Sequence, residues 1–180
     1  MAGNAVVAKV GRLMRTLGID PAIRSTGFAI LEGDHSNARA LDFGVISIPT
    51  KVPQSKALSA ICSHIKHLIE KWEPDEVAVE GIIYVQSHRT AIAMGAARAA
   101  TLIAAANFSL PIYEYSPKKV KQAVVGKGNA DKNQVAFMVR ALLKLPETPP
   151  SDAADALAIA LSHLQASDPL RAKALDRKQV

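Results

Sequence analysis

Hydrophobic and polar positions alternate along the first fifty residues in a pattern that predicts three strands. The apolar stretches are bounded by polar or turn-forming residues and span residues 15–19, 26–32 and 38–48. Asp20-Pro21 follows the first stretch and Gly33-Asp34 the second, and such pairs are typical of turns. We therefore expect the chain to open with an antiparallel meander.

After Pro53 the spacing of apolar residues lengthens from two to between three and four, which is typical of a helix that ends near Trp72. Strands and helices then alternate. Further strands are expected at 76–80 and 111–115, and helices at 86–107, 118–124, 130–144 and 152–165. This order predicts an α/β fold with a mixed five-stranded sheet and helices on both of its faces.

The length of 180 residues fits one domain. We expect a loose N-terminal extension over 1–14, in which Met14 is an alternative start, and a folded domain over 15–165. Residues 166–180 are expected to form a basic flexible tail.

Composition narrows the class of protein. The net charge of +6 favours a polyanionic partner, although a basic surface that only aids solubility explains it equally well. The one cysteine, Cys62, excludes a disulfide within the chain and a cysteine-rich metal site, and it favours a reducing, cytoplasmic location. No segment has the apolar length that a bilayer requires.

Four carboxylates stand where strands end or a helix begins. Asp20 and Glu80 close the first and fourth strands, and Asp152 and Asp155 are three residues apart at the start of the last helix, on one helical face. Oxygen ligands of this kind suit Mg²⁺ or Mn²⁺, and two ions about 4 Å apart could support phosphodiester hydrolysis.

Each carboxylate also has an ordinary structural interpretation. Asp20 before proline is a common turn initiator, and Glu80 is compatible with an exposed loop. Asp152 is a candidate N-cap, and Asp155 would complement the helix dipole. Spacing alone does not decide between these roles and a nuclease site.

Four segments resemble the RuvC family of Holliday-junction resolvases, in the family's order and over nearly all of residues 15–165. They are LGIDPAIRSTGFAI at 17–30, PDEVAVEGI at 74–82, YSPKKVKQAVVGKGNADKNQV at 115–135 and SDAADALAIALSH at 151–163. The resemblance implies an RNase H-like fold and Mg²⁺-dependent, symmetrical nicking of four-way DNA junctions by a homodimer. It also implies partnership with the junction-binding and branch-migration proteins RuvA and RuvB.

The resemblance assigns catalytic and metal-binding roles to Asp20, Glu80, Asp152 and Asp155. It places Lys121 and Lys132 near the scissile phosphate. The neighbouring Lys118, Lys119 and Lys127 would add attraction to the DNA backbone, although lysines that only solvate a loop would give the same sequence.

The chain departs from the family at two points. Ala22 stands where the family usually has glycine, and Ile83 stands where it commonly has the phenylalanine that wedges between bases. Either Ile83 or the adjacent Tyr84 is a candidate wedge, and Arg89 is a further candidate DNA contact. The small residues of the helix at 86–107 fit a dimer interface, as the resemblance implies, or an intramolecular core.

Three rival functions stay open on the sequence. GIDPAIRSTG also resembles the phosphate-binding opening of sugar kinases and actin-like ATPases. An RNase H-like enzyme that processes RNA would have a similar site. A non-catalytic junction-binding module is the third, although such a protein has no need to collect carboxylates where phosphates approach.

Overall fold

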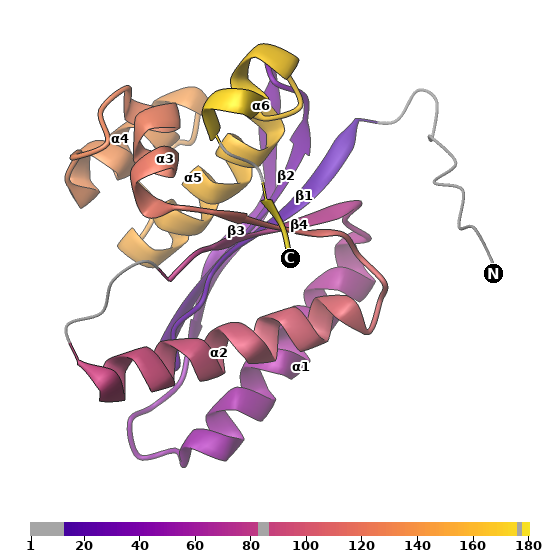
Figure 1. Cartoon of the computed structure of the whole chain (residues 1–180), viewed down its shortest axis with the longest axis vertical. Coiled ribbons are helices and arrows are strands. Elements are labelled where there is room, and N and C mark those ends of the chain that lie inside the picture. The colour runs from indigo at the N-terminus through magenta and orange to yellow at the C-terminus, as the bar shows by residue number, and fades with distance from the viewer. Residues whose placement is uncertain (1–12, 83–86, 176–177) are drawn as a thin grey trace.

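A six-stranded mixed sheet organises the molecule, as the computed structural model shows for residues 13–82, 87–175 and 178–180 (Figure 1). The strands are β1 (Met14–Asp20), β2 (Ser25–Gly33), β3 (Ala38–Ser47), β4 (Glu76–Glu80), β5 (Ile112–Tyr115) and β6 (Lys178–Gln179). The helices are α1 (Gln54–Trp72), α2 (His88–Ala106), α3 (Pro117–Val125), α4 (Lys132–Leu142), α5 (Ser151–Gln165) and α6 (Pro169–Leu175). Residues 1–12 of the expected extension, and the candidate wedges Ile83 and Tyr84, lie outside the described residues. Met14 already belongs to β1.

The strand order is β3-β2-β1-β4-β5-β6. β1, β2 and β3 form the predicted antiparallel meander, whereas β4 runs parallel to β1 and β5 runs parallel to β4. Since parallel neighbours end at the same edge of a sheet, β1 and β4 deliver their last residues to one place. The predicted mixed sheet with helices on both faces is confirmed.

Side chains of the central strands alternate between two cores. Leu17 and Ile19 of β1 pack with α1 and α2 on one face, which is the lower one in Figure 1. On the other face, the small Ala29 of β2 and Ala78 of β4 pack against α5 and its neighbours α3, α4 and α6. Small residues on that face allow α5 to lie unusually close to the sheet.

Two glycines mark the closest approach of α5. A Cβ atom at Gly18 of β1 would lie 2.4 Å from the carbonyl oxygen of Ala156, and one at Gly27 of β2 would lie 2.0 Å from the carbonyl oxygen of Asp152. Both distances are far below van der Waals contact, and both contacts are with helix backbone. The position of α5 therefore depends on the absence of side chains at Gly18 and Gly27.

A series of buried, hydrogen-bonded side chains fixes the opposite end of α5. His163, whose side chain is fully buried, pairs through Nε2 with a carboxylate oxygen of Glu76 at 2.6 Å. Its Nδ1 pairs with the hydroxyl of Tyr115 at 2.8 Å. Because buried polar groups need partners, these bonds fix the rotation of α5 relative to β4 and β5.

Two expectations for the end of the chain are wrong. The sheet gains a sixth strand, because β6 pairs antiparallel with β5 and Val180 N donates to the Ile112 carbonyl at 3.0 Å. The segment predicted as a flexible tail also contains α6. Leu175 is buried against the core, and Lys119 Nζ donates to the Ala174 carbonyl at 2.7 Å, so α6 is tied to α3. Among the described helices, none combines the length and apolar character needed to cross a membrane.

Candidate active site

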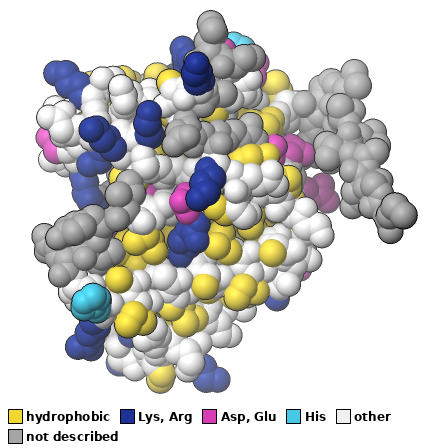
Figure 2. All heavy atoms as spheres, viewed as in Figure 1, with side chains coloured by type: hydrophobic (Ala, Val, Ile, Leu, Met, Phe, Trp, Pro, Cys, Tyr) yellow, Lys and Arg dark blue, Asp and Glu magenta, His cyan; other side chains and the backbone are white. Residues whose placement is uncertain are grey.

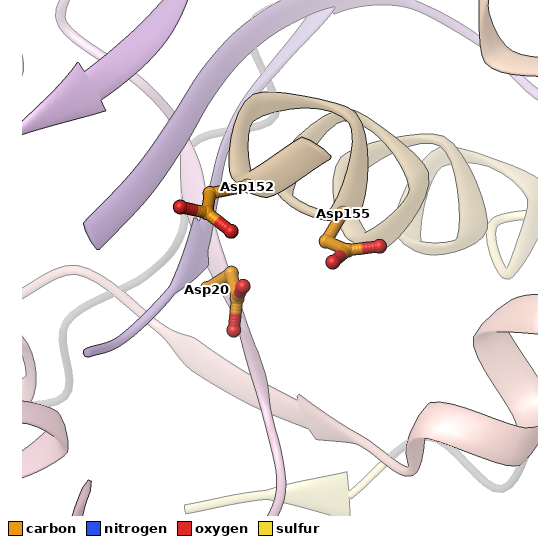
Figure 3. A group of neighbouring side chains, drawn as sticks. All are labelled: Asp20, Asp152 and Asp155. Carbon is orange, nitrogen blue, oxygen red and sulfur yellow. The ribbon is translucent and has the colours of Figure 1, made fainter. Parts of the chain in front are cut away.

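Three aspartates from two elements converge at one edge of the sheet. Asp20 is the last residue of β1, and Asp152 and Asp155 lie in the first turns of α5. Each offers a carboxylate oxygen, and these three oxygens lie within 4.8 Å of one another. Figure 3 shows the carboxylates of the strand and of the helix directed into the same space. Three of the four carboxylates that the sequence singles out therefore come together.

The turn after Asp20 aims its carboxylate. Thr26 closes the turn, since its Oγ1 accepts from Ala22 N at 3.3 Å and donates to the Ala22 carbonyl at 2.5 Å. The non-glycine residues with positive φ in the described chain are Glu73, Ser109 and Lys144, so Ala22 has an ordinary backbone conformation. The alanine that replaces the family's usual glycine is thus accommodated without strain.

Asp152 is held by a partner from the strand. The hydroxyl of Ser25, at the start of β2, donates to Asp152 Oδ2. The N-cap of α5 is Pro150, which makes no side-chain capping bond, and Asp152 lies within the first turn. The alternative interpretation of Asp152 as an N-cap is therefore wrong, and its carboxylate is oriented toward the strand edge.

Glu80 lies beside this group. It is the last residue of β4, one position beyond the Ile19–Val79 pair of the parallel β1–β4 ladder, which places it next to Asp20. Its oxygens are not among the three that lie within 4.8 Å. Its charge nevertheless interacts with those of Asp20 and Asp155, so all four predicted carboxylates belong to one electrostatic unit.

Burial and mutual repulsion change the acidity of these groups. Burial, followed by repulsion from Asp155 and Asp152, raises the pKa of Asp20 to about 6. Burial, followed by repulsion from Asp20 and Asp155, raises the pKa of Glu80 to about 8. Burial also raises the pKa of Asp155. Such a cluster holds its full negative charge only when cations neutralise it.

Two of the predicted lysines face the carboxylates. Lys132 Nζ lies 3.6 Å from Asp155 Oδ2, and its positive charge opposes the rise in the pKa of Asp155. Lys121 acts in the same way on Glu80 and Asp155. The side chain of Lys132 is 68% exposed, so its ammonium group is accessible to a phosphate approaching the site.

A hollow of about 490 Å³ opens beside Glu80; we call it the Glu80 hollow. Lys118 and Lys121 line it from α3, and the remaining lining residues are Gly81, Ile82, Met94, Pro117, Gly128 and Asn129. Gly128 leaves room for the side chain of Lys118, because a Cβ atom there would be 2.7 Å from Lys118 Cγ.

The other two described DNA-contact candidates line different hollows. Lys127 borders one with Phe137 of α4. Arg89, at the start of α2, borders another with Arg24, whose Nη1 donates to the carbonyls of Pro49 and Val52. Lys118, Lys121 and Lys132 thus lie with the carboxylates, whereas Lys127 and Arg89 line other hollows.

Sequence reasoning missed the residues that support the site. Ser25 orients Asp152, and Gly18 and Gly27 set the height of α5 above the sheet. All three lie inside the segment at 17–30 that carries the resemblance. A small or polar residue in an otherwise apolar strand was the available signal, but its partner on α5, more than 100 residues later, was not visible.

The donor set fits a hard divalent cation. All its ligand atoms are carboxylate oxygens, which Mg²⁺ and Mn²⁺ prefer, and in the described chain neither cysteine nor histidine belongs to the group. Burial and, after it, mutual repulsion raise the pKa values of Asp20 and Glu80, and a bound cation would offset both effects.

Comparisons with known proteins agree with this geometry. A family model described as crossover junction endodeoxyribonuclease RuvC matches residues 16–163. The protein of that name from Akkermansia muciniphila is 65% identical over 167 residues, which are 93% of this chain and 100% of that protein.

Solved structures share the fold. The structure of Thermus thermophilus RuvC in complex with Holliday junction substrate has a TM-score of 0.82 at 34% identity, covering 93% of this chain and 99% of that one. The yeast mitochondrial Holliday junction resolvase Ydc2, at 15% identity and a TM-score of 0.64 over 93% and 82% of the two chains, supports the fold alone. The predicted RNase H-like fold class is confirmed. The chain belongs to the RuvC family of crossover junction endodeoxyribonucleases.

Proposed function

We propose that this chain is a metal-dependent endonuclease that resolves four-way DNA junctions by nicking two strands symmetrically, in recombination and repair. The observation that carries the proposal is the convergence of Asp20, Asp152 and Asp155 within 4.8 Å, beside basic side chains, in a chain of this family. A centre of carboxylates would repel a phosphodiester unless cations were bound between them. The acidic group and its basic surroundings are therefore best explained together by metal-assisted phosphodiester cleavage.

Asp20, Glu80, Asp152 and Asp155 are the proposed ligands of Mg²⁺, with two ions per site and Mn²⁺ as a substitute. The bound cations would supply an activated water and stabilise the leaving oxygen. The contribution of the chain is to hold the ligands in place. Ser25 fixes Asp152, and the end of β4 keeps Glu80 next to Asp20. Because Glu80 has a pKa of about 8, it gives up its proton when a cation binds at neutral pH.

Lys121 and Lys132 are the proposed contacts to the phosphate beside the scissile bond. Both are close enough to the carboxylates to influence the pKa of Asp155. An ammonium group there can stabilise the negative charge that develops on phosphate oxygens. Lys118 in the Glu80 hollow, and Lys127 and Arg89 in their own hollows, are proposed to attract the flanking backbone.

The proposed active form is a homodimer that pairs through α2. Ile92 and Ile103 on this helix are 70% and 58% exposed, and a second copy that covered them would remove apolar surface from water. A Cβ atom added to Gly95 would meet open space, so the same helix can be approached closely. Figure 2 shows apolar side chains spread over the surface where α2 lies. Two copies would provide the two active sites that paired nicks require.

Junction DNA, the pathway proteins RuvA and RuvB, and a cytoplasmic location complete the proposal. The support for junction DNA is the likeness to the Thermus thermophilus protein described in complex with a Holliday junction substrate. The two protein partners rest on the family resemblance alone. The location rests on the single cysteine.

The test is cleavage of a mobile four-way DNA junction in Mg²⁺, with EDTA, linear duplex and an RNA–DNA hybrid as comparisons. We expect paired nicks in the junction alone. Cleavage of the hybrid would favour an RNA-processing enzyme, and hydrolysis of ATP would favour the kinase-like alternative. Junction binding without cleavage in any divalent cation would support the binding module and contradict the proposal.

The matched variant is Asp20→Asn, which keeps the size of the side chain and removes its charge. We expect cleavage to fall by more than about 100-fold, since even residues behind metal ligands cost about 10- to 100-fold. Junction binding should persist, because it depends on the basic side chains. Cleavage at the wild-type rate by this variant would refute the metal-site assignment.

A further inference from the structure

Helix α3 carries basic residues on two of its sides. Lys118 and Lys121 are three positions apart and line the Glu80 hollow. Lys119 lies on the other side of α3 and lines a second hollow, which we call the α6 hollow. In Figure 2 Lys and Arg side chains gather over the upper half of the molecule, where α3, α4 and α6 lie. The basic surface thus continues past the proposed active site.

The α6 hollow has a volume of about 350 Å³ and lies between α3, α5 and α6. Its polar lining comes from Lys119, Gln122, Gln165 and Arg171, and its apolar lining from Ala123, Ala174 and Leu175. The bond from Lys119 Nζ to the Ala174 carbonyl and the burial of Leu175 hold α6 against α3. The hollow is therefore a built feature that needs the C-terminal segment in place.

The lining chemistry fits a phosphodiester with its sugar. Arginine offers a planar fork of N–H donors that matches phosphate oxygens, and lysine adds a compact positive charge. The Arg171 side chain is 54% exposed, and its Nε lies 3.9 Å from Asp168 Oδ2. That long ion pair keeps Arg171 near the hollow but leaves its guanidinium accessible to a ligand. The apolar lining from Ala123 and Ala174 can accommodate the carbons of a sugar.

The two hollows flank a helix whose width matches a groove of duplex DNA. They lie on either side of one helix, and an α-helix with its side chains is about 10–12 Å across. The major groove of B-DNA is about 12 Å wide. A duplex lying on α3 could therefore place the phosphates of one strand at Lys118 and Lys121 and those of the other strand at the α6 hollow.

We propose that α3 docks into a groove of a junction arm, and that Lys119 and Arg171 bind the backbone of the strand on the far side of that groove. This inference rests on the proposed function, because it extends the DNA-binding surface of the same site. It assigns a role to α6, which would be a second clamp on the substrate. Removing the clamp should weaken the electrostatic part of binding and leave the reaction centre intact.

The experiment measures the affinity of the full-length protein for a labelled four-way junction in EDTA over a series of salt concentrations. Each lost phosphate contact lowers the slope of log K against log salt by about 0.9. For Arg171→Gln, the fall in affinity between about 50 and about 200 mM salt should thus be about 3.5-fold smaller than for the wild type. Lys119→Gln should act in the same direction, and the double variant should change the slope by about twice as much.

Lys66→Gln on α1 is the matched control, because it removes one positive charge from the other face of the sheet. It should keep the wild-type slope. If the wild type cuts junctions but Arg171→Gln has the same salt slope as Lys66→Gln, the inference is wrong and the proposed function stands. Failure of the wild-type protein to bind or cut junctions would instead overturn the proposed function and this inference with it.

Discussion

At the scale of single residues, the site is a compromise between charge and burial. Asp20 and Glu80 are held where their charged forms are disfavoured, so their pKa values rise to about 6 and about 8. An exposed carboxylate would ionise without this penalty, but it would also bind a cation only weakly. The same environment that destabilises the metal-free protein therefore gives it affinity for divalent ions.

This compromise predicts how stability depends on pH. In the unfolded chain Asp20 and Glu80 titrate near 3.8 and 4.5, so between these values and about 6 and 8 the folded protein binds more protons than the unfolded one. The free energy of unfolding in EDTA should then fall as pH rises from about 4 to about 8. Thermal unfolding of wild type and Glu80→Gln across this range checks the prediction. As pH rises, the melting temperature of the wild type should fall relative to that of the variant. Added Mg²⁺ should raise the melting temperature of the wild type most at high pH.

Ser25 allows a second test at this scale. Its hydroxyl holds Asp152 Oδ2, so Ser25→Ala should let that carboxylate rotate and should lower activity by about 10- to 100-fold at a limiting concentration of Mg²⁺. Part of the loss should be recovered at saturating Mg²⁺. Ser47→Ala, at an exposed position on β3, is the control and should behave as wild type. An unchanged Mg²⁺ dependence in Ser25→Ala would show that this bond does not position Asp152.

At the scale of elements, the site depends on how closely α5 approaches the sheet. Gly27→Ala would push a methyl group into the Asp152 carbonyl, and overpacking of this kind costs about 1–3 kcal/mol. We expect a lower melting temperature and weaker Mg²⁺ activation together, because the displaced backbone carries Asp152, one of the proposed ligands. Gly44→Ala on β3 is the comparison, since its Cβ would meet only the Phe28 ring at 3.2 Å. If Gly27→Ala unfolded earlier but bound Mg²⁺ normally, the link between packing and metal binding would be wrong.

The elements themselves could largely be predicted from the sequence. The prediction of β4 at 76–80 is confirmed at both ends, because Pro74-Asp75 and Gly81 bound it. α4 was expected from 130 but begins at Lys132, since Asp131 caps it with a bond from Gln134 N. α6 and β6 were missed because they have seven and two residues, too few for a periodic pattern, and because long-range contacts such as Lys119 to Ala174 hold them.

The sequence predicts only those parts of the candidate site that follow from local patterns along the chain. Asp20, Asp152 and Asp155 stand at element ends, and element ends can be found by pattern. The parallel β1–β4 ladder then brings Glu80 next to Asp20, and the local pattern alone does not give this strand order. Tertiary packing places Lys121 in the Glu80 hollow and Lys127 in another hollow, and no spacing in the sequence distinguishes the two lysines.

At the scale of the whole molecule, the prediction concerns assembly. Ile103→Glu would place a charge in the proposed α2–α2 contact and should convert a dimer to a monomer in sedimentation or light scattering. Paired nicking should then be lost, while single nicks in a junction continue at a reduced rate. Phe137→Glu changes another exposed apolar residue, on α4, and should leave the dimer intact. If Ile103→Glu remained a dimer like the wild type, the interface could not lie on this face of α2.

The burial of α5 has a consequence for how this protein could change over evolution. Eleven consecutive or nearly consecutive positions from Ala153 to Leu164 are buried, so the helix that bears two of the aspartates has almost no surface on which substitutions would be neutral. The segments that border the Glu80 and α6 hollows, α3 and the loop before α4, are by contrast half-buried or exposed apart from Val120, Val124 and Ala130. New preferences for nucleic-acid shape or sequence would therefore arise in those segments, and an ancestral reaction centre could persist while its targets diversified.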